Sequence, residues 1–108
     1  MSDPVKAIAR RLNRMCNPIA HLVLDQSRSE DWHSLLFDGG RHHLDLRLVG
    51  EDLDDILRAL PSWIAADDFI IAGHLIADMK LSMLGRQAGQ ASLSLEALTI
   101  ADRQSVNA

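Results

Sequence analysis

Residues His74 to Ala101 read HLIADMKLSMLGRQAGQASLSLEALTIA, and this is the most informative stretch of the chain. Apolar residues alternate with polar ones on both sides of a central loop, and a period of two is typical of strands with one buried face. The loop GRQAG spans residues 85–89, and its two glycines can adopt positive φ at little cost. The pattern therefore predicts a long antiparallel hairpin over residues 74–101.

The loop also suggests a register for this hairpin. If Leu84 pairs with Gln90, then Asp78 faces Glu96 on the polar side of the two strands. Like charges directly opposite each other are unfavourable by roughly 0.2–1 kcal/mol, so the pair invites a cation, a raised pKa or a function. Together with His74, the two carboxylates are the candidates for acid–base chemistry.

A structural explanation of these carboxylates competes with the catalytic one. The apolar alternation slips between Leu95 and Leu98, which predicts a β-bulge that would move Glu96 away from Asp78. Lys80 lies on the same face and could neutralise Glu96 without any function. The hairpin alone therefore does not indicate an enzyme.

The composition is that of a single globular domain over residues 1–108. Hydrophobic residues make up 47% of the chain and charged residues 24%, and no window approaches the apolar length of a membrane span. The amino terminus lacks the apolar core of a secretory signal, and the lone Cys16 cannot form an internal disulfide. We therefore expect a cytoplasmic protein with no membrane association.

The first sixteen residues predict an amphipathic helix. Ser2 or Asp3 can cap it, Pro4 suits its first turn, and Pro18 ends it. Four basic residues and the single Asp3 give this segment a net charge of +3. Because the whole chain has a net charge of −4, the remaining residues carry a net charge of −7. The residues of this basic face are Lys6, Arg10, Arg11 and Arg14.

A basic face raises the question of nucleic-acid binding. The segment has no interleaved aromatic residues, and the acidic remainder of the chain would repel phosphate, so we do not expect nucleic acid as the main partner. The simpler interpretation is a helix whose basic face is solvated or lies against an acidic surface of its own domain or of a partner subunit.

A first hairpin is predicted over residues 31–49, with Gly39 and Gly40 in its turn and Leu35 opposite Leu44. The short run from Ile19 to Asp25 is read as a strand, although it could also prolong the helical region, and residues 26–31 are read as a polar loop.

A central helix is predicted over residues 51–66. Its apolar residues have helical spacing, and acidic residues crowd its first turn, where the helix dipole favours negative charge. Pro61 predicts a kink or a break. The tail, residues 103–108, is polar and expected to fray.

The element order predicts an α+β fold. Two hairpins form a four- or five-stranded antiparallel sheet, and the central helix covers its apolar face. The outer face is then covered by the N-terminal amphipathic helix or by a second copy of the chain. Large apolar residues predicted there form the expected interface: Trp32, Leu36, Ile76, Leu98 and Ile100.

The five histidines do not indicate a metal site. None has a ligand spacing such as HExxH, and the neighbours His42 and His43 point to opposite faces of a strand. His33 and His42 are expected at the margin of the core, and His74 at the start of a strand. We expect neither a metal nor another cofactor.

The element order, small size and acidity resemble those of dimeric chaperones of bacterial secretion systems, a likeness of layout that carries no residue motif and no function. The leading hypothesis is a non-enzymatic protein-interaction module, adaptor or chaperone-like, that acts as a homodimer. The alternatives are a small enzyme or ligand-binding protein that uses Asp78, Glu96 and His74 or His43, and nucleic-acid binding through the basic helix.

Overall fold

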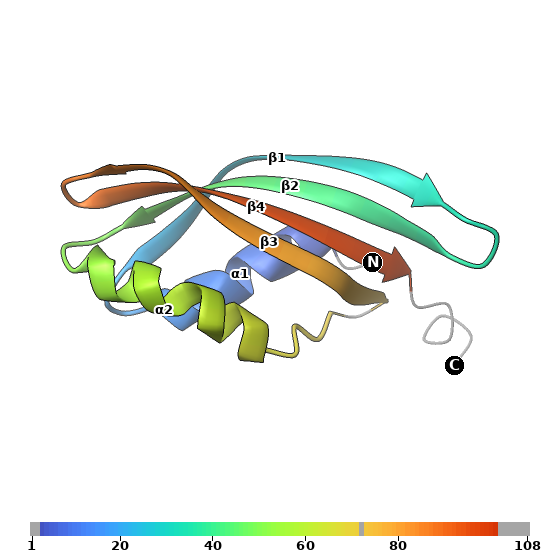
Figure 1. The fold of residues 1–108 in the computed structure, drawn as a ribbon, viewed down its shortest axis with the longest axis horizontal. Helices are drawn as coiled ribbons and strands as arrows, with labels where there is room; N and C mark the ends of the chain where they lie inside the picture. Colours follow the sequence, from blue (N-terminus) through green and yellow to red (C-terminus); the bar gives the residue numbers. More distant parts are fainter. Residues whose placement is uncertain (1–2, 72, 102–108) are drawn as a thin grey trace.

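The computed structural model describes residues 3–71 and 73–101 (Figure 1). The predicted tail at residues 103–108 and the possible cap Ser2 lie outside this part of the chain. The elements follow one another as α1 (Pro4–Cys16), β1 (His21–His33), β2 (Asp38–Val49), α2 (Leu53–Ala66), β3 (His74–Gln87) and β4 (Gln90–Ala101).

The four strands form one antiparallel sheet in the order β1-β2-β4-β3. The predicted α+β class is therefore confirmed, with four strands in the described sheet. The β1–β2 hairpin and the β3–β4 hairpin are joined by pairing between β2 and β4 at the centre of the sheet. β1 and β3 therefore form its two edges.

The prediction for the first hairpin was wrong in its boundaries and register. β1 runs without a break from His21 to His33, so the predicted strand, polar loop and start of the hairpin are one element. The turn consists of residues 34–37, and His33 pairs with Asp38. Ser34 explains the turn, since its hydroxyl accepts a hydrogen bond from the Phe37 amide, at 3.0 Å, and its own amide donates to the Phe37 carbonyl, at 2.8 Å.

The glycines expected in that turn lie in β2, where they allow close contacts. A Cβ on Gly39 would collide with the Thr99 carbonyl and would lie 2.6 Å from the Trp32 ring. Gly40 similarly faces the His42 ring, 2.8 Å from where its Cβ would be. Leu35, which we expected in a strand opposite Leu44, lies fully exposed at the turn.

Both helices pack on the same face of the sheet, which we call the inner face (Figure 1). The expectation that the N-terminal helix covers the other, outer face is therefore wrong. The physical reason is the single apolar stripe of each helix, since both stripes join one core with the leucines of β2 and β4. The helical residues buried there are Val5, Ile8, Leu12, Cys16, Leu53, Ile56 and Leu60.

The helix ends follow the sequence closely. Asp3 is the N-cap of α1, and its carboxylate accepts a hydrogen bond from the Val5 amide at 3.0 Å. Cys16 is buried, and burial raises the pKa of its thiol. α2 continues through Pro61 as one helix, so the break considered there does not occur.

The second hairpin has the predicted extent, but its register differs. The turn is the shorter Ala88–Gly89 pair, and Gln87 pairs with Gln90. Register shifts in β3 between Ile76 and Asp78 and between Met83 and Gly85 absorb the difference. A bulge lies in β3, at position 77, rather than at Glu96 in β4.

Candidate functional site

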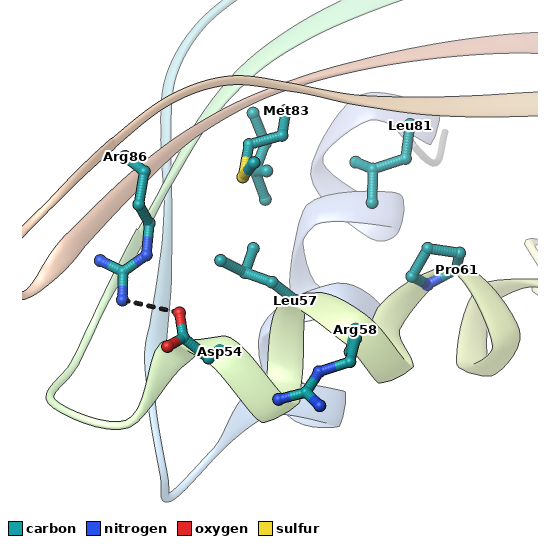
Figure 2. A pocket seen from close by; sticks show the side chains of 8 residues that line it. Asp54, Leu57, Arg58, Pro61, Leu81, Met83 and Arg86 are labelled. Atoms are coloured by element: carbon teal, nitrogen blue, oxygen red, sulfur yellow. Dashed lines mark hydrogen bonds and ion pairs between the residues drawn. The ribbon is translucent and has the colours of Figure 1, made fainter.

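A groove of about 500 Å³ opens between α2 and β3 (Figure 2). Leu57 rises from α2 toward Leu81 and Met83, which point down from β3, and Pro61 closes the far end. We call this feature the α2–β3 groove; its lining is Asp54, Leu57, Arg58, Pro61, Leu81, Met83, Arg86 and Leu93.

Charged groups stand at the rim of this groove. The Arg86 guanidinium donates to the Asp54 carboxylate at 3.1 Å, which bridges β3 to the first turn of α2. Arg58, one turn further along α2, pairs with Asp55 at 2.9 Å. The groove thus has an apolar floor and a rim that carries both signs of charge, which suits another protein surface better than a chemical reaction.

The groove borders a free sheet edge. β3 pairs only with β4 in the described sheet, so one row of its backbone amides and carbonyls faces outward. Three large apolar side chains on this strand are exposed: Leu75 to 55% and, nearer the groove, Met83 to 59% and Leu84 to 65%. An apolar groove beside an unpaired strand is a surface that a second polypeptide can complete.

The carboxylates predicted to face each other do not meet. Asp78 pairs with Leu98 and Glu96 pairs with Lys80, because the turn lies at Ala88–Gly89 instead of spanning residues 85–89, which shifts the register of β3. His74 lies with His42 in a cleft on the inner face, while Glu96 lies beside His43 on the outer face. Asp78 and Glu96 are therefore not directly opposite each other in the described sheet.

The outer face carries a polar network at its centre. The His43 ring lies 3.1 Å from the Asp45 carboxylate and 3.8 Å from that of Glu96. Gln26 donates to Asp45 at 2.6 Å. The Gln26 hydrogen bond is the largest influence that lowers the pKa of Asp45, and the contact with His43 adds to it.

The apolar residues predicted on the outer face are only partly found there. Trp32 lies over Gly39, whose neighbour across the sheet is Ile100. Ile76 was misplaced, since it packs against the core on the inner face, and Leu75 takes the outer position opposite Ile100. Leu36 also does not belong to this face, because it lies in the β1–β2 turn, 76% exposed.

A second cleft, of about 460 Å³, lies on the inner face beside the N-terminus of α1. His42 is buried there, with its ring nitrogens 2.8 Å from the Ser29 hydroxyl and 2.9 Å from the Thr99 hydroxyl. His74 lines the same cleft, and its Nδ1 is buried with no hydrogen-bond partner among the described residues. His42 thus matches its predicted place at the core margin, whereas His33 is exposed and pairs with Asp38 at 2.9 Å.

The basic face of α1 is exposed, as its amphipathic pattern predicts. Arg11 lies against the acidic connector after α2, with its Nε 2.9 Å from the Asp67 carboxylate. Arg10, Arg11 and Arg14 also line a small hollow of about 150 Å³ next to that connector.

The α2–β3 groove was not predicted from the sequence. The signal is the adjacent apolar pair Met83 and Leu84, which breaks the alternation of the strand. Within residues 3–71 and 73–101, no group of three or more histidine, cysteine, aspartate or glutamate side chains could hold a metal ion. No helix in that part of the chain is long and apolar enough to cross a membrane. Comparison with protein-family models, curated proteins and solved structures finds no match to this chain.

Proposed function

We propose that this chain is a non-enzymatic protein-interaction module, adaptor or chaperone-like, that acts as a homodimer. The observation that carries the proposal is the open α2–β3 groove beside the free edge of β3, where Met83 and Leu84 are exposed. In the dimer, the β3 edges of two copies pair and each groove is closed by apolar side chains of the other copy.

The two sheet edges differ in how they resist strand addition. β1 has a register shift between Leu24 and Gln26, and charged, exposed residues follow it at Arg28 and Glu30. Charges and bulges of this kind protect an edge from pairing. β3 has its irregularities at positions 77 and 84, which leaves the segment from Asp78 to Met83 regular. β3 is therefore the edge that accepts another strand.

The regular segment of β3 can pair with a copy of itself. In an antiparallel pair centred on Leu81, each Leu81 faces its equivalent and Met79 faces Met83, all on the inner face. On the outer face Lys80 then faces Ser82, so no like charges meet. A register centred on Lys80 is disfavoured because it would place two lysines opposite each other.

The helix beside the edge follows the same symmetry. Both helices lie on the inner face, so a twofold axis perpendicular to the sheet and centred on Leu81 would bring the two copies of α2 side by side and antiparallel. The charged groups at the rim are already paired within each copy, Arg86 with Asp54 and Arg58 with Asp55.

Light scattering after size-exclusion chromatography tests the proposal. At micromolar concentration we expect twice the chain mass of 12.0 kDa. The variant Met83→Glu should be monomeric, because it places a charge between the two paired β3 strands. Met83 is 59% exposed in the single chain, so the substitution should leave the fold of each copy intact. The matched control Leu36→Glu, at an exposed leucine in the β1–β2 turn, should remain dimeric.

Two results would contradict the proposal. A monomeric wild-type protein at these concentrations would remove the homodimer. A dimer that survives Met83→Glu and dissociates with Leu75→Glu would instead place the contact on the outer face, as the sequence predicts.

A further inference from the structure

A small hollow separates α1 from the connector between α2 and β3. Arginines of α1 form one wall, and the other wall is the connector at residues 69–71. The hollow measures about 150 Å³, which is room for one side chain of a ligand. It lies within a single copy of the chain and shares no lining residue with the α2–β3 groove.

Asp67 holds the two walls together. One carboxylate oxygen accepts a hydrogen bond from Arg11 Nε at 2.9 Å, and the other accepts from the Phe69 amide at 2.7 Å. Burial disfavours the charge of Asp67, but these two hydrogen bonds outweigh it and lower the pKa of the carboxyl. Phe69, which is buried, has a φ of 42°, a backbone conformation that persists only where the surroundings impose it. The hollow is therefore a preformed feature of the fold.

The positive charge in the hollow is not balanced. Arg11 is paired with Asp67, whereas Arg10 and Arg14 make no ion pair or side-chain hydrogen bond to any residue that the structure describes. These two guanidinium groups stand one helical turn apart, where like charges repel each other. An anionic group placed between them would relieve this repulsion and accept charge-assisted hydrogen bonds from both.

An apolar side chain completes the surroundings. Ile70 follows the strained Phe69 and is 90% exposed, directly at the mouth of the hollow. A ligand that supplies both a carboxylate and a neighbouring apolar group would cover Ile70 and neutralise the arginines at once. A nucleic acid fits less well, because Asp67 and Asp68 flank the hollow and the whole chain has a net charge of −4.

From these observations we infer that the hollow bounded by Arg10, Arg14 and Ile70 binds an acidic side chain of a partner polypeptide, with an adjacent apolar side chain of that partner resting on Ile70. The partner segment thus contains an acidic residue next to an apolar one. The two guanidinium groups recognise the carboxylate, and the apolar contact distinguishes a peptide from a free anion.

Fluorescence anisotropy with a labelled hexapeptide of alternating glutamate and leucine tests this inference. We expect saturable binding to the full chain, and the double variant Arg10→Gln/Arg14→Gln should weaken it by about tenfold or more, because two charge-assisted hydrogen-bonding groups are lost. The matched control Arg28→Gln/Arg41→Gln removes the same charge from the outer face and should leave the affinity within about twofold. The variant Ile70→Ser should lower the affinity for the peptide without changing the salt dependence of binding.

Several outcomes would overturn the inference. These are no saturable binding of the hexapeptide, equal loss of affinity in the two double variants, and equal binding of a glutamine-for-glutamate peptide. Tighter binding of a twelve-nucleotide single-stranded DNA would assign the basic face to nucleic acid instead. Because the hollow lies within one copy, the Met83→Glu variant should bind the peptide as the wild type does, so the homodimer and the peptide site can fail separately.

Discussion

Gly39 is the residue whose role differs most from its sequence pattern. Its neighbour Gly40 and the surrounding polar residues suggest a tight turn, yet Gly39 lies in β2 because Trp32 and the Thr99 carbonyl occupy the space of a side chain. Gly39→Ala should therefore lower the free energy of unfolding by about 1–3 kcal/mol, the usual cost of overpacking. Denaturant unfolding followed by circular dichroism measures the change.

Gly85 provides the matched control for this substitution. It also lies in a strand, but a Cβ there would meet nothing within 4 Å. Gly85→Ala should leave the stability unchanged or raise it by up to about 1 kcal/mol, since alanine reduces the freedom of the unfolded chain. Equal losses in the two variants would show that strand geometry, rather than the contact with Trp32 and Thr99, determines the effect.

His42 makes the stability of the fold depend on pH. Burial lowers the pKa of His42, and the nearby His74 lowers it further, while Asp3 and Asp31 act in the opposite direction. Below the usual value of 6.5 the unfolded chain therefore binds a proton that the folded chain does not yet bind. This contribution to stability is complete above that pH and is lost as the pH falls through it toward the lower, folded pKa.

Urea unfolding at about pH 7.5 and about pH 5.5 brackets this transition and tests its origin. The wild type should lose more stability between the two conditions than His42→Gln, which cannot be protonated but keeps a hydrogen-bonding side chain. A variant that loses as much stability as the wild type would assign the pH dependence to other groups.

At the scale of the elements, the two helices begin in different ways. Asp3 caps α1 through hydrogen bonds from Val5 and Lys6 amides, whereas Asp52 stands at the N-cap of α2 without any side-chain hydrogen bond. Asp3→Ala should cost about 0.5–2 kcal/mol of stability, and Asp52→Ala much less. Thermal unfolding of the two variants checks the difference, and a larger loss in Asp52→Ala would contradict the assignment of the cap.

Local signals were sufficient to predict the elements whose limits are set by neighbouring residues. Asp3, Pro4 and Pro18 enclose α1, and the two glycines at residues 85–89 mark the region of the β3–β4 turn. β1 could not be predicted in the same way. The C-terminal half of β1 is polar, and it extends along the sheet beyond the two helices (Figure 1). This half is a strand because it pairs with β2, although it has no buried face.

The candidate site was predictable only in part, for a similar reason. The predicted carboxylate pair depended on the register of β3, and this register depends on the position of the turn and on the bulges in the strand. The exposed basic face of α1 was predicted, since helical periodicity places its arginines without tertiary information. The hollow beside it was not, because Phe69 and Ile70 reach α1 through the distant Asp67–Arg11 contact.

For the whole molecule, placing both helices on one face has consequences on both sides of the sheet. The helices share one core, so the outer face is left to its own polar network of His43, Asp45 and Glu96. On the inner side α2 stands off from β3 and leaves the α2–β3 groove open. A chain that leaves apolar surface open beside a free strand gains stability when a partner covers it.

The proposed homodimer therefore predicts that thermal stability depends on protein concentration. Association of folded chains pulls the unfolding equilibrium toward the native state, so the Tm of the wild type should rise as the concentration is increased across the dissociation range. The Tm of Met83→Glu should be independent of concentration. At high concentration it should lie below that of the wild type, because the variant does not gain the free energy of pairing two β3 edges. Leu36→Glu should follow the wild-type dependence, since its side chain lies in the distant β1–β2 turn. Scanning calorimetry over roughly a hundredfold range of protein concentration measures this dependence. Mass action is expected to stabilise the native state by up to about 2.7 kcal/mol over that range. A wild-type Tm that does not change with concentration would contradict the proposed dimer.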